Sequence, residues 1–317
     1  MNYFIVGDAL DTLRQFRDGC VQTCVTSPPY FGLRDYGEAG QIGLEPSPDE
    51  FVAALVEVFR EVHRVLRDDG TLWLNLGDSY SRSPAKGGSG PGGKNEDRWG
   101  YGVAQSAKTG SSDGTVGRGD RPGSRSGGLG EKQLLGIPWR VAFALQADGW
   151  FLRQDIIWHK PNPMPESVTD RCTKAHEYIF LLSKSPKYFF DNVAIKEAAS
   201  GRPPGNKKPT KGGREYAETD GDYHRTAANL HNIGARETRN KRSVWTVTTK
   251  PFKGAHFATF PPDLIEPCIL AGSAPGDVVL DPFGGAGTVN LVCARHGRTG
   301  VYIDLNPEYA TLARNRT

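Results

Sequence analysis

The sequence predicts an α/β fold with a mixed, mostly parallel sheet and an antiparallel edge strand. A β-branched run at residues 21–25 alternates like a strand and stops at two prolines, which cannot continue a hydrogen-bonded ladder. An apolar run at 278–280 leads through a glycine-rich turn into a helical run. Two further apolar runs, at 178–182 and 187–190, follow each other closely, as in an antiparallel pair at the edge of such a sheet.

The other elements follow from hydrophobic periodicity along the chain. Phe51, Leu55 and Val62 recur at helical spacing behind a cap at Ser47, which predicts a helix that residues 68–70 end. Further helices are predicted at 9–16, 139–147, 262–270, 289–295 and 307–314, and further strands at 1–6, 71–76, 151–158 and 299–303. Strands that alternate with helices in this way are expected to pair in parallel.

Chain length and composition predict one large domain with two polar inserts. The chain has 317 residues, and we expect a single domain over 1–317. Residues 81–130 are rich in Gly, Ser, Lys and Arg and predict a long insert loop, either a phosphate-contacting arm or a solvated linker. Residues 192–246 are again polar and basic. The formal net charge of +3 does not by itself prove a nucleic-acid partner.

Several classes of protein are disfavoured. We find neither a signal peptide nor an apolar run of membrane length, so no membrane partner is expected. The five cysteines are scattered without a C-x-x-C pair, which fits reduced thiols and argues against a structural zinc site. No metal site is therefore predicted.

The stretch Ser27-Pro28-Pro29-Tyr30 has the chemistry to hold a planar amine. The prolines leave carbonyl oxygens and the Ser27 hydroxyl free at the carboxyl end of a strand, where open α/β sheets place their ligands. Tyr30 adds a flat aromatic face beside these acceptors. A planar heterocycle with an amino group would fit this arrangement, although a strand that simply ends in a turn would show the same residues.

A second stretch, at 281–288, predicts a nucleoside site. Gly285 and Gly287 allow close approach of a ligand to the backbone, and the next strand ends at Asp304, a carboxylate placed to accept ribose hydroxyls. Asp281 and Pro282 stand where the dinucleotide fingerprint would begin. The turn therefore favours a bound adenosine over a pyrophosphate.

Together the two stretches resemble the amino-group DNA methyltransferases that use S-adenosylmethionine, with the β-class order of catalytic segment before cofactor turn. The resemblance implies a Rossmann-like methyltransferase sheet, a base held by Ser27 to Tyr30, and a cytoplasmic enzyme of a prokaryote or phage. It implies these cofactor-binding residues: Asp8, Ala9, Thr259, Phe260, Asp281, Pro282, Phe283, Gly285, Gly287, Thr288 and Asp304. Asp8 also fits a helix N-cap, and both roles are compatible.

The resemblance also implies double-stranded DNA as substrate, with the target base flipped out of the helix. A W-x-K-P-N-P-x-P run is similar to a segment beside the base pocket, and the region 192–246 stands where target recognition is expected. The predicted DNA-binding residues are Lys160, Asn162, Arg214, Arg225, Arg239 and Lys241. The sequence leaves open a homodimer and a cognate restriction endonuclease as further partners.

The target amine follows from one residue of the catalytic segment. In the family, Ser at the position of Ser27 is common in cytosine-N4 enzymes, whereas Asp or Asn is commoner in adenine-N6 enzymes. Cytosine N4 is therefore favoured, with adenine N6 as the alternative. A DNA-binding module without catalysis, and an enzyme that methylates RNA or a small molecule, are competing interpretations that labelled methyl transfer would separate.

Overall fold

The computed structural model divides the chain into two compact units, Met1–Asp191 with Ser243–Thr317, and Asn192–Arg242. It describes residues 1–33, 37–38, 40–81, 129–199, 237–249 and 260–317. Almost all of the predicted insert loop at 81–130 therefore lies outside the described residues. Within the described part of the chain, no helix has the length and apolar character needed to cross a membrane.

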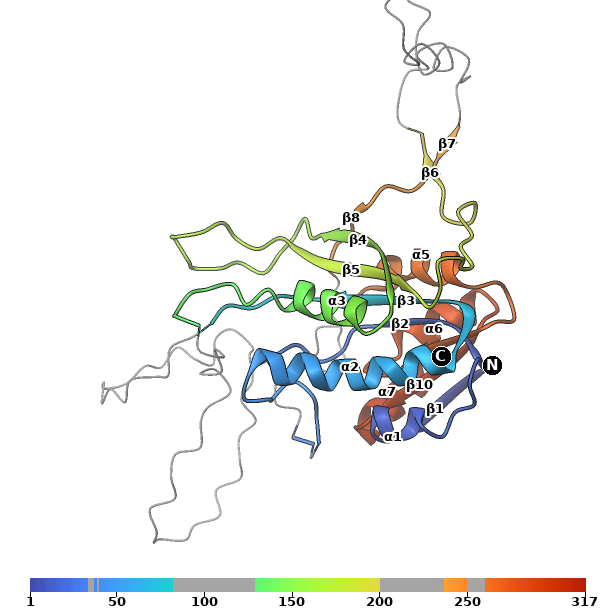
Figure 1. The fold of residues 1–317 in the computed structure, drawn as a ribbon. Helices are drawn as coiled ribbons and strands as arrows, with labels where there is room; N and C mark the ends of the chain where they lie inside the picture. Colours follow the sequence, from blue (N-terminus) through green and yellow to red (C-terminus); the bar gives the residue numbers. More distant parts are fainter. Residues whose placement is uncertain (34–36, 39, 82–128, 200–236, 250–259) are drawn as a thin grey trace, which may run out of the picture. The chain divides into compact units, whose positions relative to one another are not determined.

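An eight-stranded sheet forms the centre of the first unit, with the order β1-β10-β9-β2-β3-β5-β4-β8 (Figure 1). Its strands are β1 (Asn2–Val6), β2 (Val21–Thr26), β3 (Leu66–Leu76), β4 (Phe151–His159), β5 (His176–Ser183), β8 (Val244–Thr246), β9 (Val278–Asp281) and β10 (Thr299–Asp304). Only β5 runs against both of its neighbours in this described sheet. The α/β class and mostly parallel pairing are confirmed, but the reversed strand lies inside the sheet and not at its edge.

Helices cover the two faces of this sheet. They are α1 (Ala9–Leu13), α2 (Pro48–Val65), α3 (Ile137–Ala147), α5 (Pro262–Gly272), α6 (Thr288–Arg295) and α7 (Pro307–Arg316). Neighbouring residues of a strand point to opposite faces. Leu72 and Leu74 of β3 join the same core cluster as Phe51 of α2, whereas Trp73 lies against Gly272 of α5.

The long helix α2 begins as the sequence predicts and ends earlier. Ser47 caps it, because its hydroxyl oxygen accepts the Glu50 N–H at 3.2 Å, and Pro48 takes the first turn. The helix ends at Val65, and Leu66 already pairs with Val21 of β2. The predicted end at residues 68–70 was wrong because pairing with β2 draws this segment into the sheet.

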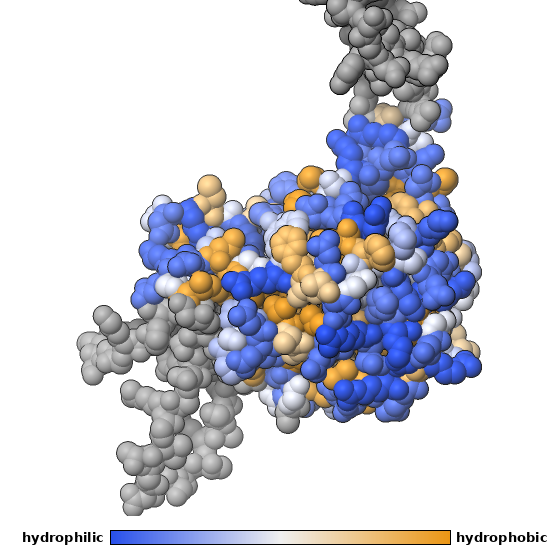
Figure 2. Space-filling model, viewed as in Figure 1, coloured by the Kyte–Doolittle hydropathy of each residue, from blue (hydrophilic) through white to orange (hydrophobic). Residues whose placement is uncertain are grey.

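A strand predicted at 187–190 is absent from this described segment. The Phe189 N–H donates to the Asp69 carbonyl at 2.9 Å, and the Phe190 ring stacks on Trp73 with centroids 6.2 Å apart. The antiparallel partners of β5 are β3 and β4 instead. On the face seen in Figure 2, hydrophilic side chains are interspersed with apolar ones. The main core cluster lies beneath the surface, where residues of β2 and β3 pack against α2 and α3.

The second unit contains a short antiparallel pair, β6 (Glu197–Ala198) with β7 (Thr238–Arg239). The Glu197 carboxylate accepts from Arg239 at 2.7 Å and from Arg242 at 2.6 Å. The predicted recognition region, 192–246, starts where this unit starts but also includes β8, which pairs with β4 in the first unit. Its role in target recognition stays a prediction.

Candidate active site

The catalytic stretch and the glycine-rich turn leave the sheet side by side. Strand β9 lies between β10 and β2, and Cys24 of β2 is in register with Leu280 of β9. Because these strands are parallel, Ser27 and Pro282 follow strand ends on the same edge of the sheet. Segments more than 250 residues apart in the sequence therefore meet at one site.

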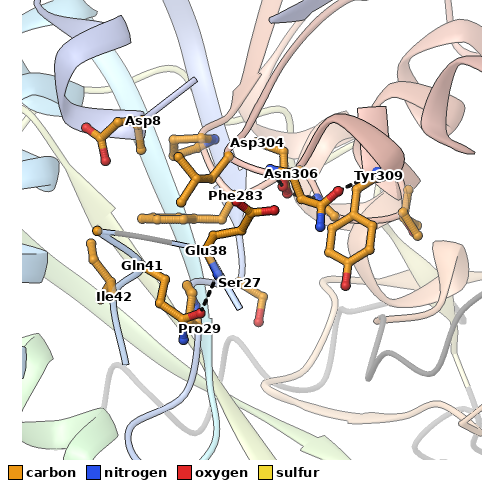
Figure 3. A pocket seen from close by; sticks show the side chains of 18 of the residues that line it. Asp8, Ser27, Pro29, Glu38, Gln41, Ile42, Phe283, Asp304, Asn306 and Tyr309 are labelled. Atoms are coloured by element: carbon orange, nitrogen blue, oxygen red, sulfur yellow. Dashed lines mark hydrogen bonds between the residues drawn. The ribbon is translucent and has the colours of Figure 1, made fainter. Parts of the chain in front are cut away.

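A cavity opens at this edge and contains most of the predicted cofactor residues (Figure 3). The predicted residues that line it are Asp8, Ala9, Ser27, Pro29, Phe260, Pro282, Phe283, Gly285, Thr288 and Asp304. Sequence reasoning missed a further set: Glu38, Gly40, Gln41, Ile42, Gly284, Ala286, Leu305, Asn306 and Tyr309. Thr259 lies outside the described residues.

Asp304 at the end of β10 is fixed by two backbone groups. Its carboxylate accepts the Gly285 N–H at 2.8 Å and the Asn306 N–H at 2.9 Å. Burial raises the pKa of Asp304, and the nearby Glu38 carboxylate raises it further. A carboxylate has about four acceptor sites, so Asp304 retains acceptors for ligand hydroxyls.

Asp281 and Gly287 are placed beside the cavity and do not line it. The buried Asp281 Oδ1 accepts the Thr26 hydroxyl at 2.7 Å and the Phe283 N–H at 3.2 Å. Gly287 has φ +72°, and a Cβ on it would lie 2.5 Å from the Ala313 Cβ of α7. Asp281 and Gly287 are therefore better placed to stabilise the turn than to contact a ligand.

Asp8 takes both of its predicted positions. Its carboxylate accepts the Asp11 N–H at 2.9 Å and so caps α1, and the same residue lines the cavity. The short helix thus fixes a carboxylate at the cavity wall. Contact of Asp8 with a cofactor stays a prediction.

The cavity is acidic. Three carboxylates, those of Asp8, Glu38 and Asp304, line it, and none of its described lining residues is Lys, Arg or His. Such a lining repels phosphate and attracts cations. Across the described part of the chain, no group of His, Cys, Asp and Glu is arranged to hold a metal ion.

The catalytic stretch is divided between the cavity and the protein behind it. Ser27 and Pro29 line the cavity, and Pro28 and Tyr30 are not among its lining residues. The Tyr30 hydroxyl donates to Glu177 Oε2 of β5 at 2.8 Å. Tyr30 is therefore directed towards the neighbouring strand ends and away from the cofactor cavity.

Comparison with known proteins identifies the family. The sequence model of the DNA methylase family N6_N4_Mtase matches residues 21–315. The chain belongs to this family. The Type II methyltransferase M.XycI of Xanthomonas campestris pv. cyanopsidis is 50% identical over 98% of this chain and 85% of its own length.

Solved structures share the fold of this methylase. The cytosine-N4-specific PvuII DNA methyltransferase superposes with a TM-score of 0.63 at 18% identity, over 99% of this chain and 86% of that chain. The M1.HpyAVI–SAM complex gives a TM-score of 0.52 at 16% identity, over 100% and 98% of the two chains. These structures confirm the predicted α/β methyltransferase fold, and the family model and M.XycI confirm the predicted family and enzyme class.

The predicted DNA-binding residues of the methylase are largely engaged within the protein. Lys160 forms an ion pair with Glu177. Asn162 exchanges two hydrogen bonds with the Thr249 backbone, at 3.1 and 3.0 Å, and Arg239 pairs with Glu197 in the second unit. Lys241 is half-buried, and Arg214 and Arg225 lie outside the described residues. Contact of these residues with DNA stays a prediction.

Proposed function

We propose that this methylase transfers the methyl group of S-adenosylmethionine to N4 of a flipped cytosine in double-stranded DNA. The observation that supports this most is the acidic cavity, which reaches Ser27 of the catalytic stretch. The methyl donor and the amine would meet where the ends of β2 and β9 lie together. The similarity to M.XycI, a Type II methyltransferase of a bacterium, supports a role for this methylase in a restriction–modification system of the cytoplasm.

The cavity lining fits this cofactor better than it fits a phosphorylated nucleotide. S-adenosylmethionine has two positive groups, the sulfonium and the ammonium, and its reactive methyl is on the sulfonium. Three lining carboxylates and no described basic side chain suit such a cation. In this proposal Asp304, which lines the cavity, would accept the ribose hydroxyls, and the Phe283 ring would pack against the adenine.

Residues of the catalytic stretch would activate the amine. The lone pair of an exocyclic amine is delocalised into the ring, so the amine is a poor nucleophile. The Ser27 hydroxyl and the Pro28 carbonyl would accept its two N–H hydrogens and favour a tetrahedral nitrogen with a localised lone pair. Positioning is the main contribution of the protein, because the cofactor supplies the reactive bond.

The choice of base rests on Ser27. A neutral hydroxyl stands at the first position of the stretch, as is common in cytosine-N4 enzymes, where adenine-N6 enzymes more often have Asp or Asn. Adenine N6 is the alternative, since both bases present an amine beside a ring nitrogen.

The test is methyl transfer with identification of the product. Unmethylated genomic DNA is incubated with the protein and labelled cofactor, digested to nucleosides and separated. We expect N4-methylcytosine; N6-methyladenine would refute the base choice, and unlabelled DNA would refute the reaction. Ser27→Ala should lose transfer, because the Ser27 hydroxyl would no longer accept from the amine. Ser185→Ala is the matched control, because that hydroxyl donates only to the nearby Lys187 carbonyl in the described contacts.

A further inference from the structure

A half-buried polar network lies behind Tyr30, at the ends of four neighbouring strands. Tyr30 follows β2, Asn75 is in β3, Glu177 is in β5 and Lys160 follows β4, in the order in which these strands pair. We infer that Glu177 is the positioning residue that fixes the Tyr30 ring for stacking on the flipped base. This inference rests on the proposed function, since it assigns a partner to the stacking residue.

The first step is the bond between the phenol and the carboxylate. The Tyr30 hydroxyl lies 2.8 Å from Glu177 Oε2 and 3.3 Å from Asn75 Oδ1. A phenol has one hydrogen to donate, and the shorter distance gives it to the carboxylate. Hydrogen bonds to an ionised acceptor are about twice as strong as neutral ones.

Asn75 orients the same carboxylate. Its amide group donates to the Tyr178 carbonyl at 3.0 Å and to Glu177 Oε2 at 3.3 Å, and its side chain is almost fully buried. Because both amide hydrogens of Asn75 are donated to Tyr178 and Glu177, its oxygen is the atom that faces the Tyr30 hydroxyl. Asn75 therefore acts on Tyr30 mainly through Glu177, and its own oxygen is the more distant of the two acceptors for the single phenol hydrogen.

The ring itself is held against backbone. A Cβ added at Gly77 would lie 2.5 Å from the Tyr30 Cε2, so no side chain fits between the ring edge and this residue. Gly77 directly follows β3, the strand that contains Asn75. The Tyr30 ring is therefore fixed at its edge by Gly77 and at its hydroxyl by Glu177.

Lys160 keeps Glu177 in place. The two side chains form an ion pair and are only 17% and 16% exposed. The Lys160 ammonium also lies 4.1 Å from the centre of the Trp158 ring, and the Trp158 N–H donates to the Val247 carbonyl at 2.8 Å. A carboxylate fixed in this way is ready to hold the phenol before DNA arrives.

This arrangement has a consequence for catalysis. A ring already fixed in its stacking orientation loses little conformational freedom when the base enters. Loss of the Glu177 charge should therefore lower transfer to DNA and leave the cofactor cavity unchanged, because Glu177 does not line that cavity. If the Lys160–Glu177 salt bridge only stabilised the fold, loss of the Glu177 charge would lower transfer equally with and without the Tyr30 hydroxyl.

The experiment is a double-mutant cycle of Glu177→Gln and Tyr30→Phe. We expect each single variant to lower kcat/KM for DNA by roughly tenfold or more, as for a lost bond to a charged group. The kcat/KM of the double variant should lie within about threefold of that of the less active single variant, because both changes remove the same interaction. Calorimetry should show unchanged affinity for S-adenosylmethionine. Glu61→Gln is the matched control, since Glu61 is a half-buried partner of Arg64.

A second readout does not depend on activity. NMR of the protein labelled with ¹³C-tyrosine identifies the Tyr30 ring signal as the one lost in Tyr30→Phe. We expect Glu177→Gln to shift that signal and Glu61→Gln to leave it in place. An unshifted Tyr30 signal, or an equal loss of transfer from Glu177→Gln with and without the Tyr30 hydroxyl, would overturn the inference. If the wild-type protein transferred no methyl group but Glu177→Gln still shifted the Tyr30 signal, the proposed function alone would be refuted.

Discussion

The Thr26 hydroxyl donates a buried hydrogen bond to Asp281 Oδ1 at 2.7 Å, although the two residues are 255 positions apart. Thr26 directly precedes Ser27, and Asp281 directly precedes Pro282. Both residues are 1% exposed, so water does not compete for this bond. This side-chain contact therefore links the catalytic stretch to the cofactor turn, in addition to the pairing of β2 with β9.

The first prediction concerns the charge of Asp281. Burial raises the pKa of Asp281 to about 7, above the ordinary Asp value that the unfolded chain has. The folded state therefore binds this proton more tightly, and the contribution of Asp281 to stability falls as pH rises from about 4 to about 7. Asp281→Asn keeps an oxygen for Thr26 and cannot ionise.

Urea unfolding at about pH 5 and about pH 8 tests this. We expect the free energy of unfolding of Asp281→Asn, relative to the wild type, to be higher at the upper pH by a few kcal/mol. The exposed Asp18→Asn should show no comparable change between the two conditions. A difference that is the same at both pH values would contradict the buried charge.

The second prediction concerns the packing of the glycine-rich turn on α7. Gly287 and Gly297 have nearly the same backbone angle, φ +72° and +70°, but only Gly287 is close to another residue, Ala313. Alanine at either position should cost about 1 kcal/mol for the left-handed backbone. Gly287→Ala should cost about 1–3 kcal/mol more, because its Cβ would overlap the Ala313 Cβ.

Unfolding of the two alanine variants under the same conditions gives this difference directly. Equal losses of stability would show that contact with Ala313 does not decide the need for glycine at Gly287. Affinity for the cofactor, measured in parallel, would show whether the turn adjusts when α7 is displaced.

The sequence was sufficient for the parts of the site that are local in the chain. The turn after β9, and Asp304 at the end of β10, follow from short apolar runs that end in residues with distinctive chemistry. Asn306 and Tyr309 could have been found in the same way, because they follow Asp304 at the carboxyl end of a strand.

Other parts depend on contacts that periodicity does not record. Glu38 and Gln41 reach the cavity from a loop with no apolar pattern, so no rule for helices or strands selects them. The place of β5 inside the sheet depends on pairing between distant strands. The resemblance of the turn at 281–288 predicts Asp281 and Gly287 as cofactor-binding residues, but neither lines the cavity, because their contacts are with Thr26 and Ala313.

The third prediction concerns Glu38 and rests on the proposed cofactor. Glu38 is one of three carboxylates in the cavity, and its charge acts on Asp304. S-adenosylmethionine has a sulfonium that its product, S-adenosylhomocysteine, lacks. Glu38→Gln should therefore weaken binding of the cofactor more than binding of the product, by roughly threefold to tenfold. Calorimetry of both ligands with Glu38→Gln and with the exposed Glu57→Gln tests this; an equal effect on both ligands would exclude a role for the charge.

The last prediction separates the stacking role of Tyr30 from cofactor binding. Base–aromatic stacking is worth about 1–3 kcal/mol, so Tyr30→Ala should lower the rate of methyl transfer roughly 5- to 150-fold. Its affinity for S-adenosylmethionine should stay close to that of the wild type, because Tyr30 is not among the residues that line the cofactor cavity. Cofactor titration and initial rates on DNA measure the two quantities. Tyr3→Ala, at a half-exposed tyrosine of β1, is the control. Unchanged turnover in Tyr30→Ala would refute stacking on the base, and a parallel loss of cofactor affinity would place Tyr30 at the cofactor instead.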